Sequence, residues 1–211
     1  SATDSLPVGF FTTWKLADER KLARTIFINK MDKENASFER VYGELREKLG
    51  TKVVPINLPI GSHTSFEGVV DLVNMKAYYQ KGGDTVEAEI PEDLKAEAEK
   101  YREEMIEAVV VADEEILERY FEGEEISAEE IKRCMRLAAA QKEVFPVLCG
   151  SAELGIGIQP LMNMLVYGMP APVAKVPANR GGEKIELDPA SGQNAALVFK
   201  TLADPYVGKI T

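Results

Sequence analysis

Asn29, Lys30 and Asp32 stand together directly after an apolar stretch of the chain. Residues 23–28 are mostly apolar or β-branched, which predicts a buried strand that carries these side chains to its end. A fixed carboxylate such as that of Asp32 can accept both N–H donors on the Watson–Crick edge of guanine, whereas adenine offers only one donor there. Because poorly paired buried polar groups discriminate strongly between ligands, the spacing predicts a loop that binds guanine.

The other two side chains have expected roles at the same base. Asn29 would hold the imidazole side of the base and tie neighbouring loops together, and the aliphatic stem of Lys30 would lie over the ring. A simpler interpretation is that residues 29–32 cap a turn before a helix starting near Asn35, as happens after many strands.

A second stretch far along the chain has complementary chemistry. Residues 143–150 are another apolar run that predicts a buried strand, and it ends in the small residues Gly150, Ser151 and Ala152. Small side chains leave backbone N–H groups accessible, and such groups could donate to guanine O6, the atom that Asn29 and Asp32 would not cover. A plain strand-to-helix turn is the alternative. Taken together, the two stretches indicate one base-binding site.

The periodicity of apolar residues predicts an α/β fold around these loops. Expected helices cover 12–21, 36–49, 113–122, 127–141 and 158–167, and a long helix opens at Pro91 with an apolar stripe that reaches Val109. The helix over 158–167 is expected to have Leu161, Met164 and Leu165 facing inward. Expected strands cover 24–29, 52–58, 66–73, 75–80, 85–90, 143–150, 196–200 and 206–210, and those between 66 and 90 form an antiparallel meander. Residues 1–10 are expected to be irregular. Pro55 indicates an edge strand or a bulge, and Pro146 indicates a pairing problem.

Composition limits the classes of function. With 211 residues and 45% hydrophobic content the chain can bury a core in one or two domains, and its formal net charge of −10 argues against nucleic-acid binding by a basic surface. No apolar run approaches the roughly 20 residues of a membrane span, so no membrane partner is expected. Cys134 and Cys149 are expected to be reduced structural thiols, and His63 a loop residue; neither a catalytic residue nor a metal site is predicted.

Acidic residues concentrate in the expected helices between 92 and 130, which hold close to half of the chain's 35 Asp and Glu. This charge forms either solvated helix faces or a docking surface for a basic protein partner. Composition is compatible with both.

Much of the sequence resembles the translation elongation factor G family, the GTPases that drive ribosomal translocation. The resemblance extends from about Val8 to the end of the chain and rests on NKMDKENASFERV, VPINLPIG, FEGVVDLV, FPVLCGSA, GIQPLMNMLVYGMPAP and FKTLADPYVGKIT. Release factor three and the ribosomal protection proteins share the nucleotide motifs, but the expected insert and domain junction are nearer to elongation factor G.

The resemblance implies a domain organisation and a set of ligands. Residues 1–59 and 144–169 would be the C-terminal half of a P-loop-type G domain, 60–143 an inserted α+β subdomain, 170–193 a linker and 194–211 the first strands of a β-barrel domain. Guanine would be bound by Asn29, Lys30, Asp32, Ser151 and Ala152. GTP or GDP would be the ligand, the ribosome the partner, a ribosomal stalk protein the partner of the acidic insert, and the cytoplasm the location.

Motifs that hold phosphate are not found in the 211 residues. There is no G-x-x-x-x-G-K-[ST] segment, no D-x-x-G switch and no P-G-H segment, and in the family these precede N-K-x-D. We therefore expect an internal fragment without the phosphate and Mg²⁺ site, which binds guanine nucleotides weakly and does not hydrolyse GTP.

Overall fold

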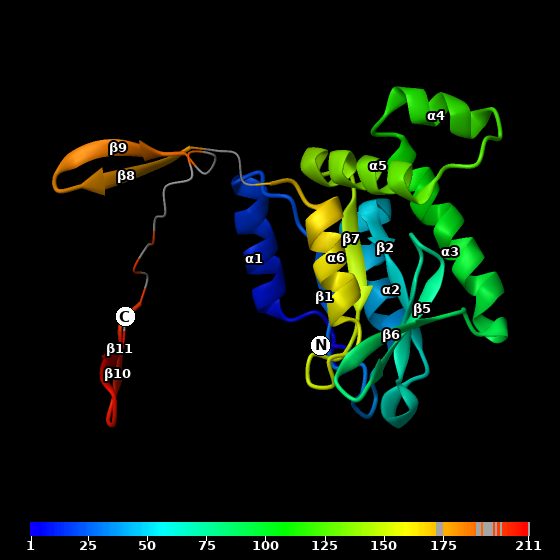
Figure 1. Ribbon diagram of the computed structural model, residues 1–211, viewed down its shortest axis with the longest axis horizontal. Helices are drawn as coiled ribbons and strands as arrows, with labels where there is room; N and C mark the ends of the chain where they lie inside the picture. The colour runs from blue at the N-terminus through cyan, green and yellow to red at the C-terminus, as the bar shows by residue number, and fades with distance from the viewer. Residues whose placement is uncertain (172–174, 189–190, 192–195, 197, 199, 211) are drawn as a thin grey trace. The chain divides into compact units, whose positions relative to one another are not determined.

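The computed structural model describes residues 1–171, 175–188, 191, 196, 198 and 200–210. They form two compact units, 1–170 and 171–211, which are treated separately below (Figure 1).

A three-stranded parallel sheet is the centre of the first unit. Its strand order is β1-β7-β2, with β7 between the other two. The strands are β1 (Ile26–Ile28), β2 (Val53–Pro55) and β7 (Phe145–Cys149), and the helices around them are α1 (Val8–Glu19), α2 (Phe38–Leu49) and α6 (Ile158–Gly168). Helix α2 begins at Phe38, two residues after the predicted start, because the Ser37 hydroxyl caps it by accepting a hydrogen bond from the Arg40 N–H, and Gly50 at φ +81° ends it.

Helix α1 begins earlier than the sequence predicted. Residues 1–10 were expected to be irregular, but the helix starts at Val8 directly after Pro7. The Phe10 ring stacks on that of Trp14, and Trp14 packs edge-on against Phe145 of β7. Aromatic contacts with the sheet therefore order a segment whose turn-forming residues suggested a loose start.

Pro146 lies in the central strand, where the sequence predicted a pairing problem. Strand β1 pairs with β7 only from Ile26, which lies opposite Val147, so Pro146 precedes that pairing. The Thr25 hydroxyl donates to the Pro146 carbonyl over 3.0 Å. On the other side Pro146 lies opposite Val54 of β2, but the adjacent Val147 makes the hydrogen bond to that strand by accepting from Ile56. The nitrogen of Pro146 therefore faces β1, where the ladder has not yet begun, and the proline is compatible with a central position.

The strand predicted over 52–58 is in fact two strands in different sheets. The Ile56 N–H still donates to Val147 of the parallel sheet, but the Ile56 carbonyl accepts from the Leu72 N–H on the other side. Strand β3 (Asn57–Ile60) then pairs antiparallel with β4 (Gly68–Asp71). The apolar residues between 52 and 58 do not indicate where the chain passes from one sheet to the other, because residues in both sheets are buried.

Few backbone groups on the free edge of β2 are available for a further strand. The Val53 N–H donates to the Gly50 carbonyl at the end of the 3-10 turn η1 (Gly50–Lys52). The Val53 carbonyl accepts from the Tyr42 hydroxyl over 3.2 Å. Pro55, which was expected to mark an edge or bulge, has no N–H, and β2 is indeed an edge strand.

The predicted antiparallel meander is confirmed. Strands β3 and β4 continue into β5 (Lys76–Lys81) and β6 (Asp84–Ala88), in the order β3-β4-β5-β6. A short turn, η2 (His63–Ser65), connects β3 to β4. Three helices follow the meander: α3 (Glu92–Val110), α4 (Glu114–Phe121) and α5 (Ala128–Gln141).

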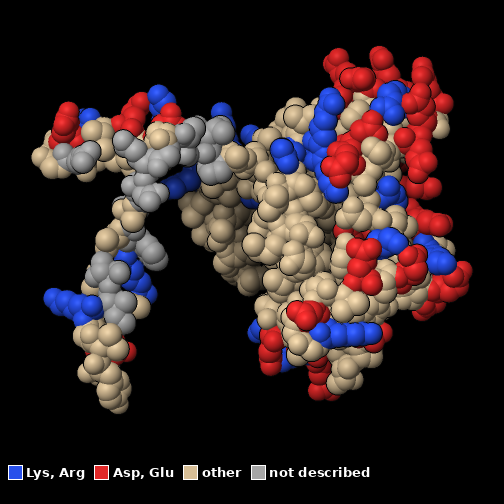
Figure 2. All heavy atoms as spheres, viewed as in Figure 1, with Lys and Arg blue, Asp and Glu red and all other residues tan. Residues whose placement is uncertain are grey.

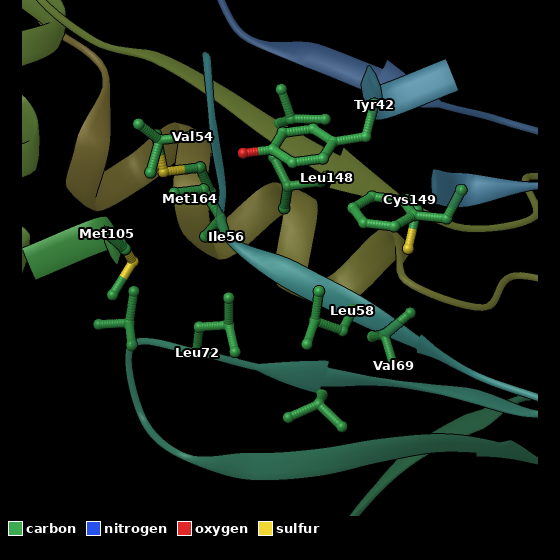
Figure 3. Close-up of a cluster of buried hydrophobic side chains, with 14 of the residues drawn as sticks. Tyr42, Val54, Ile56, Leu58, Val69, Leu72, Met105, Leu148, Cys149 and Met164 are labelled. Atoms are coloured by element: carbon green, nitrogen blue, oxygen red, sulfur yellow. The ribbon is translucent and has the colours of Figure 1, made fainter. Parts of the chain in front are cut away.

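One hydrophobic core joins the parallel sheet, the meander and the helices. Figure 3 shows part of this core, with side chains from α2, α3, α6, both sheets and the segment between β2 and β3 gathered in one cluster. Each is at most 5% exposed: Tyr42, Val54, Ile56, Leu58, Val69, Leu72, Met105, Leu148, Cys149 and Met164. The insert predicted over 60–143 thus shares its core with the rest of residues 1–170. On α6, Met164 faces inward as predicted, but Leu165 is 39% exposed and does not.

The described residues of the second unit form two hairpins. Strands β8 (Val176–Arg180) and β9 (Glu183–Leu187) pair across a turn at Gly181 and Gly182, within the segment predicted to be a linker. The predicted linker therefore contains a hairpin, because two glycines at positive φ let polar strands close it. Strand β10 (Leu202–Asp204) pairs with β11 (Gly208–Ile210). The strand predicted over 196–200 lies partly outside the described residues.

A capping box fixes the start of α5, and it yields a pH-dependent prediction. The Glu130 carboxylate accepts from the Ser127 hydroxyl over 2.6 Å and the Ser127 N–H over 2.9 Å, and it also pairs with Arg119. The Ser127 hydroxyl bond and the Arg119 pair lower the pKa of Glu130 from 4.5 to about 2. A lowered carboxyl pKa contributes stability above pH 4.5 that is lost as the pH falls toward 2.

Replacing this carboxylate should therefore cost stability only where it is ionised. Glu130→Gln should lower the free energy of unfolding at pH 7 by about 1 kcal/mol, a value discounted for partial exposure, and flatten its decline below pH 4.5. Urea unfolding at several pH values measures this, with Glu129→Gln as the control because Glu129 is 83% exposed. An equal effect of both variants at all pH values would contradict the prediction.

Candidate functional site

The loops that follow β1 and β7 lie side by side, as the two sequence stretches predicted. Because parallel strands place their carboxyl ends at one edge of the sheet, loop 29–33 meets loop 150–157 there (Figure 1). The Gly150 N–H donates to the Ile28 carbonyl over 3.1 Å, and the Met31 N–H donates to the Gly150 carbonyl over 3.2 Å. The two loops are thus joined by backbone hydrogen bonds at a fixed register.

Asn29 ties the loops together, which confirms one of its predicted roles. Its Oδ1 accepts from the Lys30 N–H over 2.7 Å and from the Ala152 N–H over 2.9 Å. With the oxygen engaged twice, the Nδ2 amino group is the part of the amide suited to donate to a ligand acceptor. Lys30 has φ +70° and an exposed side chain, so the backbone turns sharply here and directs its stem to the surface.

Asp32 presents an unpaired carboxylate oxygen. Its side chain is 9% exposed, and Oδ2 lies 3.0 Å from the Lys33 ammonium. Oδ1 is buried and has no hydrogen-bond partner among the residues that the structure describes. Burial alone would raise the pKa of Asp32, but the Ser151 hydroxyl and Lys33 outweigh it, so the pKa lies below its usual value. Buried acceptors are normally paired, so this ionised oxygen fits an N–H donor from a ligand.

The backbone N–H groups predicted to bind guanine O6 are engaged within the chain. Gly150 donates to Ile28, Ser151 donates to the Ile156 carbonyl over 2.9 Å, and Ala152 donates to Asn29. The structure thus corrects the idea that small side chains leave these groups free, because a tight loop satisfies its own donors. Ala152 is the exposed member of the three, so only its N–H can also face a ligand. The fully buried Ser151 accepts from the Leu154 N–H and shapes the loop.

Sequence reasoning missed the charged pair that bridges the loops. The Lys33 ammonium lies 2.7 Å from Glu153 Oε2 as well as 3.0 Å from Asp32. His63, predicted to be a loop residue, lies in the turn η2 and its Nδ1 donates to the Lys33 carbonyl over 3.2 Å. The position of Lys33, next to the motif, was the one available signal for its role.

Glycines permit the close packing of loop 150–157. Gly157 has φ +79°, and a Cβ at this position would lie 2.6 Å from the Cys149 carbonyl oxygen. A Cβ at Gly150 would lie 2.4 Å from the Ile156 carbonyl oxygen. Both contacts are too short for any other residue, so the loop backbone folds back directly against its own strand.

Other chemistry-bearing groups are not part of these two loops. In the part of the chain that the structure describes, no three His, Cys, Asp or Glu side chains are grouped to hold a metal ion. Cys134 and Cys149 are buried free thiols, and burial raises the pKa of both. A hollow of ~670 Å³ between α2, β2 and α3 contains no residue of either loop in its lining. Among the described helices, none is long and apolar enough to span a bilayer.

Adjacent parallel strands, connecting helices and loops that meet at the strand ends define an α/β domain of the class in which ligand sites lie at the carboxyl edge of the sheet. Comparison with known proteins specifies the class. Residues 10–171 match the family model described as the elongation factor Tu GTP binding domain. The chain therefore belongs to this family of translational GTP-binding domains.

Relatives within the family agree with the resemblance found in the sequence. The chain is 45% identical to elongation factor G of Thermotoga petrophila over 207 residues, which cover 94% of this chain and 30% of that protein. It is 44% identical to elongation factor G of Thermotoga maritima over the same shares of the two chains. A crystal structure of a Thermus thermophilus protein matches 99% of this chain and 29% of its own length, with a TM-score of 0.78 and 29% identity. The similarity to elongation factor G is thus confirmed, and the chain spans about a third of these relatives' length.

Proposed function

We propose that loops 29–33 and 150–157 recognise the guanine base of GTP or GDP in a translational GTPase. The observation that carries the proposal is the buried, ionised and unpaired Oδ1 of Asp32, which lies where the two loops meet. Guanine N1–H and the 2-amino group match such an acceptor.

The remaining contacts follow from the geometry of the loops. Asn29 Nδ2 would donate to the acceptor on the imidazole side of the base, since its Oδ1 is held by Lys30 and Ala152. The stem of Lys30 would cover one face of the ring. The Ala152 N–H would be shared between Asn29 and guanine O6, and the hydroxyl of Ser151 acts through the ionised state of Asp32.

The activity of a protein of the relatives' full length is part of the same proposal. Elongation factor G is the name of relatives whose length this chain covers by 30%. We infer a role in GTP hydrolysis on the ribosome during translocation, in the cytoplasm. The phosphates and Mg²⁺ would be held by groups other than Asn29, Asp32 and Ala152, which face the base. Residues 60–143 would act as the insert, and 194–211 as the start of a β-barrel domain.

The docking of a ribosomal stalk protein on the acidic helices stays a prediction of the sequence. Figure 2 shows acidic side chains gathered over α3 and α4. Several are paired within the chain, as Glu104 is with Arg46 over 3.2 Å and Glu124 with Arg119 over 2.6 Å. Phe121 of α4 is 78% exposed among them, which is compatible with a docking surface.

Titration with two nucleotides tests the proposed base recognition. In ¹⁵N-labelled chain, millimolar GDP should shift the backbone amide resonances of Asn29–Lys33 and of 150–153, and ADP at equal concentration should not. The phosphates of the two ligands are the same, so ADP controls for charge. Equal shifts from both nucleotides, or none from GDP at 10 mM (roughly the weakest binding such a site would show), would refute the proposal.

A further inference from the structure

The carboxamide of Asn57 takes the place of a missing strand beside β7. After Ile56 donates to Val147, the chain leaves the parallel sheet, and β3 pairs with β4 instead. The next outward-facing peptide groups of β7 on that side belong to Cys149. Asn57 Nδ2 donates to the Cys149 carbonyl over 3.1 Å, and the Cys149 N–H donates to Asn57 Oδ1 over 2.7 Å. One side chain thus supplies both partners that a continued strand would have supplied.

Only an amide can fill this position. Asn57 is 1% exposed, so water cannot replace it, and both the N–H and the carbonyl of Cys149 depend on its side chain for a hydrogen bond. A carboxylate would lose the donor, and an aliphatic side chain would lose both partners and leave buried polar groups unpaired.

The hydrogen bonds of Asn57 lead directly into the base-recognition loops. Cys149 precedes Gly150, whose N–H and carbonyl bind Ile28 at the end of β1 and Met31 in the other loop. Two residues further on, the Ala152 N–H binds Asn29. A series of hydrogen-bonded backbone groups therefore runs from the meander sheet to Asn29.

The meander approaches the same loops at two more points. His63, in the turn between β3 and β4, donates to the Lys33 carbonyl over 3.2 Å. The side chain of Gln80, on β5, lies beside Gly155, where a Cβ would be 3.5 Å from its amide nitrogen. The sheet that supplies Asn57 therefore supports both loops, although none of its own strands ends at the site.

We propose that Asn57 is a positioning residue for guanine recognition: by holding the Cys149 peptide, it fixes loop 150–157 so that Ala152 meets Asn29. The role in base binding rests on the proposed function, whereas the positioning of the loop does not. Asn57 touches no part of the base and acts through Cys149.

Hydrogen exchange of the intact chain separates positioning from general stability. In Asn57→Leu, the Ala152 N–H should exchange at least 10-fold faster than in Asn74→Leu, at equal global stability set with urea. Asn74 is the matched control because its amide also bonds within the meander, to Asp71 Oδ2 over 2.7 Å, but in the turn between β4 and β5. The GDP-induced amide shifts at Asn29 and Ala152 should disappear in Asn57→Leu and persist in Asn74→Leu. If Asn57→Leu does not fold, Asn57→Asp, which retains the acceptor for Cys149, is judged by the same criteria.

The outcomes separate two claims, the positioning of loop 150–157 by Asn57 and the recognition of guanine by the loops. Faster exchange with loss of the GDP response supports the proposal. Unchanged exchange of Ala152, or equal changes in the Asn57 and Asn74 variants, overturns it, as does faster exchange with an intact GDP response. Faster exchange in a chain whose unaltered form shows no GDP-specific shifts supports the positioning of the loop and refutes the proposed function instead.

Discussion

Asp32→Asn is expected to reverse the chain's base preference from guanine to xanthine. In guanine the 2-amino group donates to the carboxylate, whereas xanthine has a carbonyl at that position. The asparagine amide would keep an acceptor for N1–H and place a donor opposite the xanthine carbonyl. The 2-amino group of guanine would then face the N–H of the asparagine side chain, and two donors cannot bond to each other. The substitution therefore removes one favourable contact with guanine and adds a mismatch.

The expected size follows from the energy of charge-assisted hydrogen bonds. Losing such a contact costs about 3 kcal/mol, so the ratio of the dissociation constants for GDP and XDP should change by about 100-fold. Amide shifts measured against both nucleotides report this ratio. Glu153→Gln is the control, since Glu153 lies in the same site but is 69% exposed and should leave the preference unaltered. A variant that loses GDP binding without gaining XDP binding would contradict a direct contact between Asp32 and the base.

Gly157→Ala is expected to lower the free energy of unfolding by about 3 kcal/mol. About 1 kcal/mol comes from placing a Cβ at φ +79°, and about 2 kcal/mol from the contact with the Cys149 carbonyl at 2.6 Å. The contact is with backbone, which cannot rotate away as a side chain can. The loop must therefore move away from the strand that carries Cys149.

A second glycine isolates the steric part of this effect. Gly123, just after α4, has φ +83°, and a Cβ there meets nothing within 4 Å. Gly123→Ala should cost about 1 kcal/mol, the conformational part alone. Urea unfolding of both variants measures the difference. Equal losses would show that loop 150–157 yields easily and is not held against β7.

The sequence predicted the loops of the site better than it predicted what holds them. An apolar run before Asn29 and another before Gly150 indicate two buried strands, and parallel strands must bring their ends together. The antiparallel meander was equally predictable from the sequence, because polar turns separate its strands. The division of residues 52–58 between two sheets was not, since Val53, Val54 and Leu58 are apolar on both sides of the change. The role of Asn57 follows from that division and was invisible for the same reason.

The sequence also could not show whether the backbone N–H groups of residues 150–152 are already hydrogen-bonded within the chain. Small residues at Gly150, Ser151 and Ala152 do give a close approach, but the approach is that of the loop's own backbone. Which acceptor an N–H finds depends on positive-φ turns at Gly155 and Gly157, and these are set by tertiary packing. The shared core likewise obscures the boundary of the insert, because Met105 of α3 and Leu148 of β7 belong to one cluster.

The two edge strands of the parallel sheet, β1 and β2, differ in how readily they could pair with a further strand. Because Val53 is bonded to Gly50 and Tyr42, and Pro55 lacks a donor, an added strand would find few partners on that side. The opposite edge of the described sheet is β1, and the Asn29 carbonyl just beyond it accepts from the Ala2 N–H. A strand added at that edge would therefore lie beside the loop that is proposed to read the base.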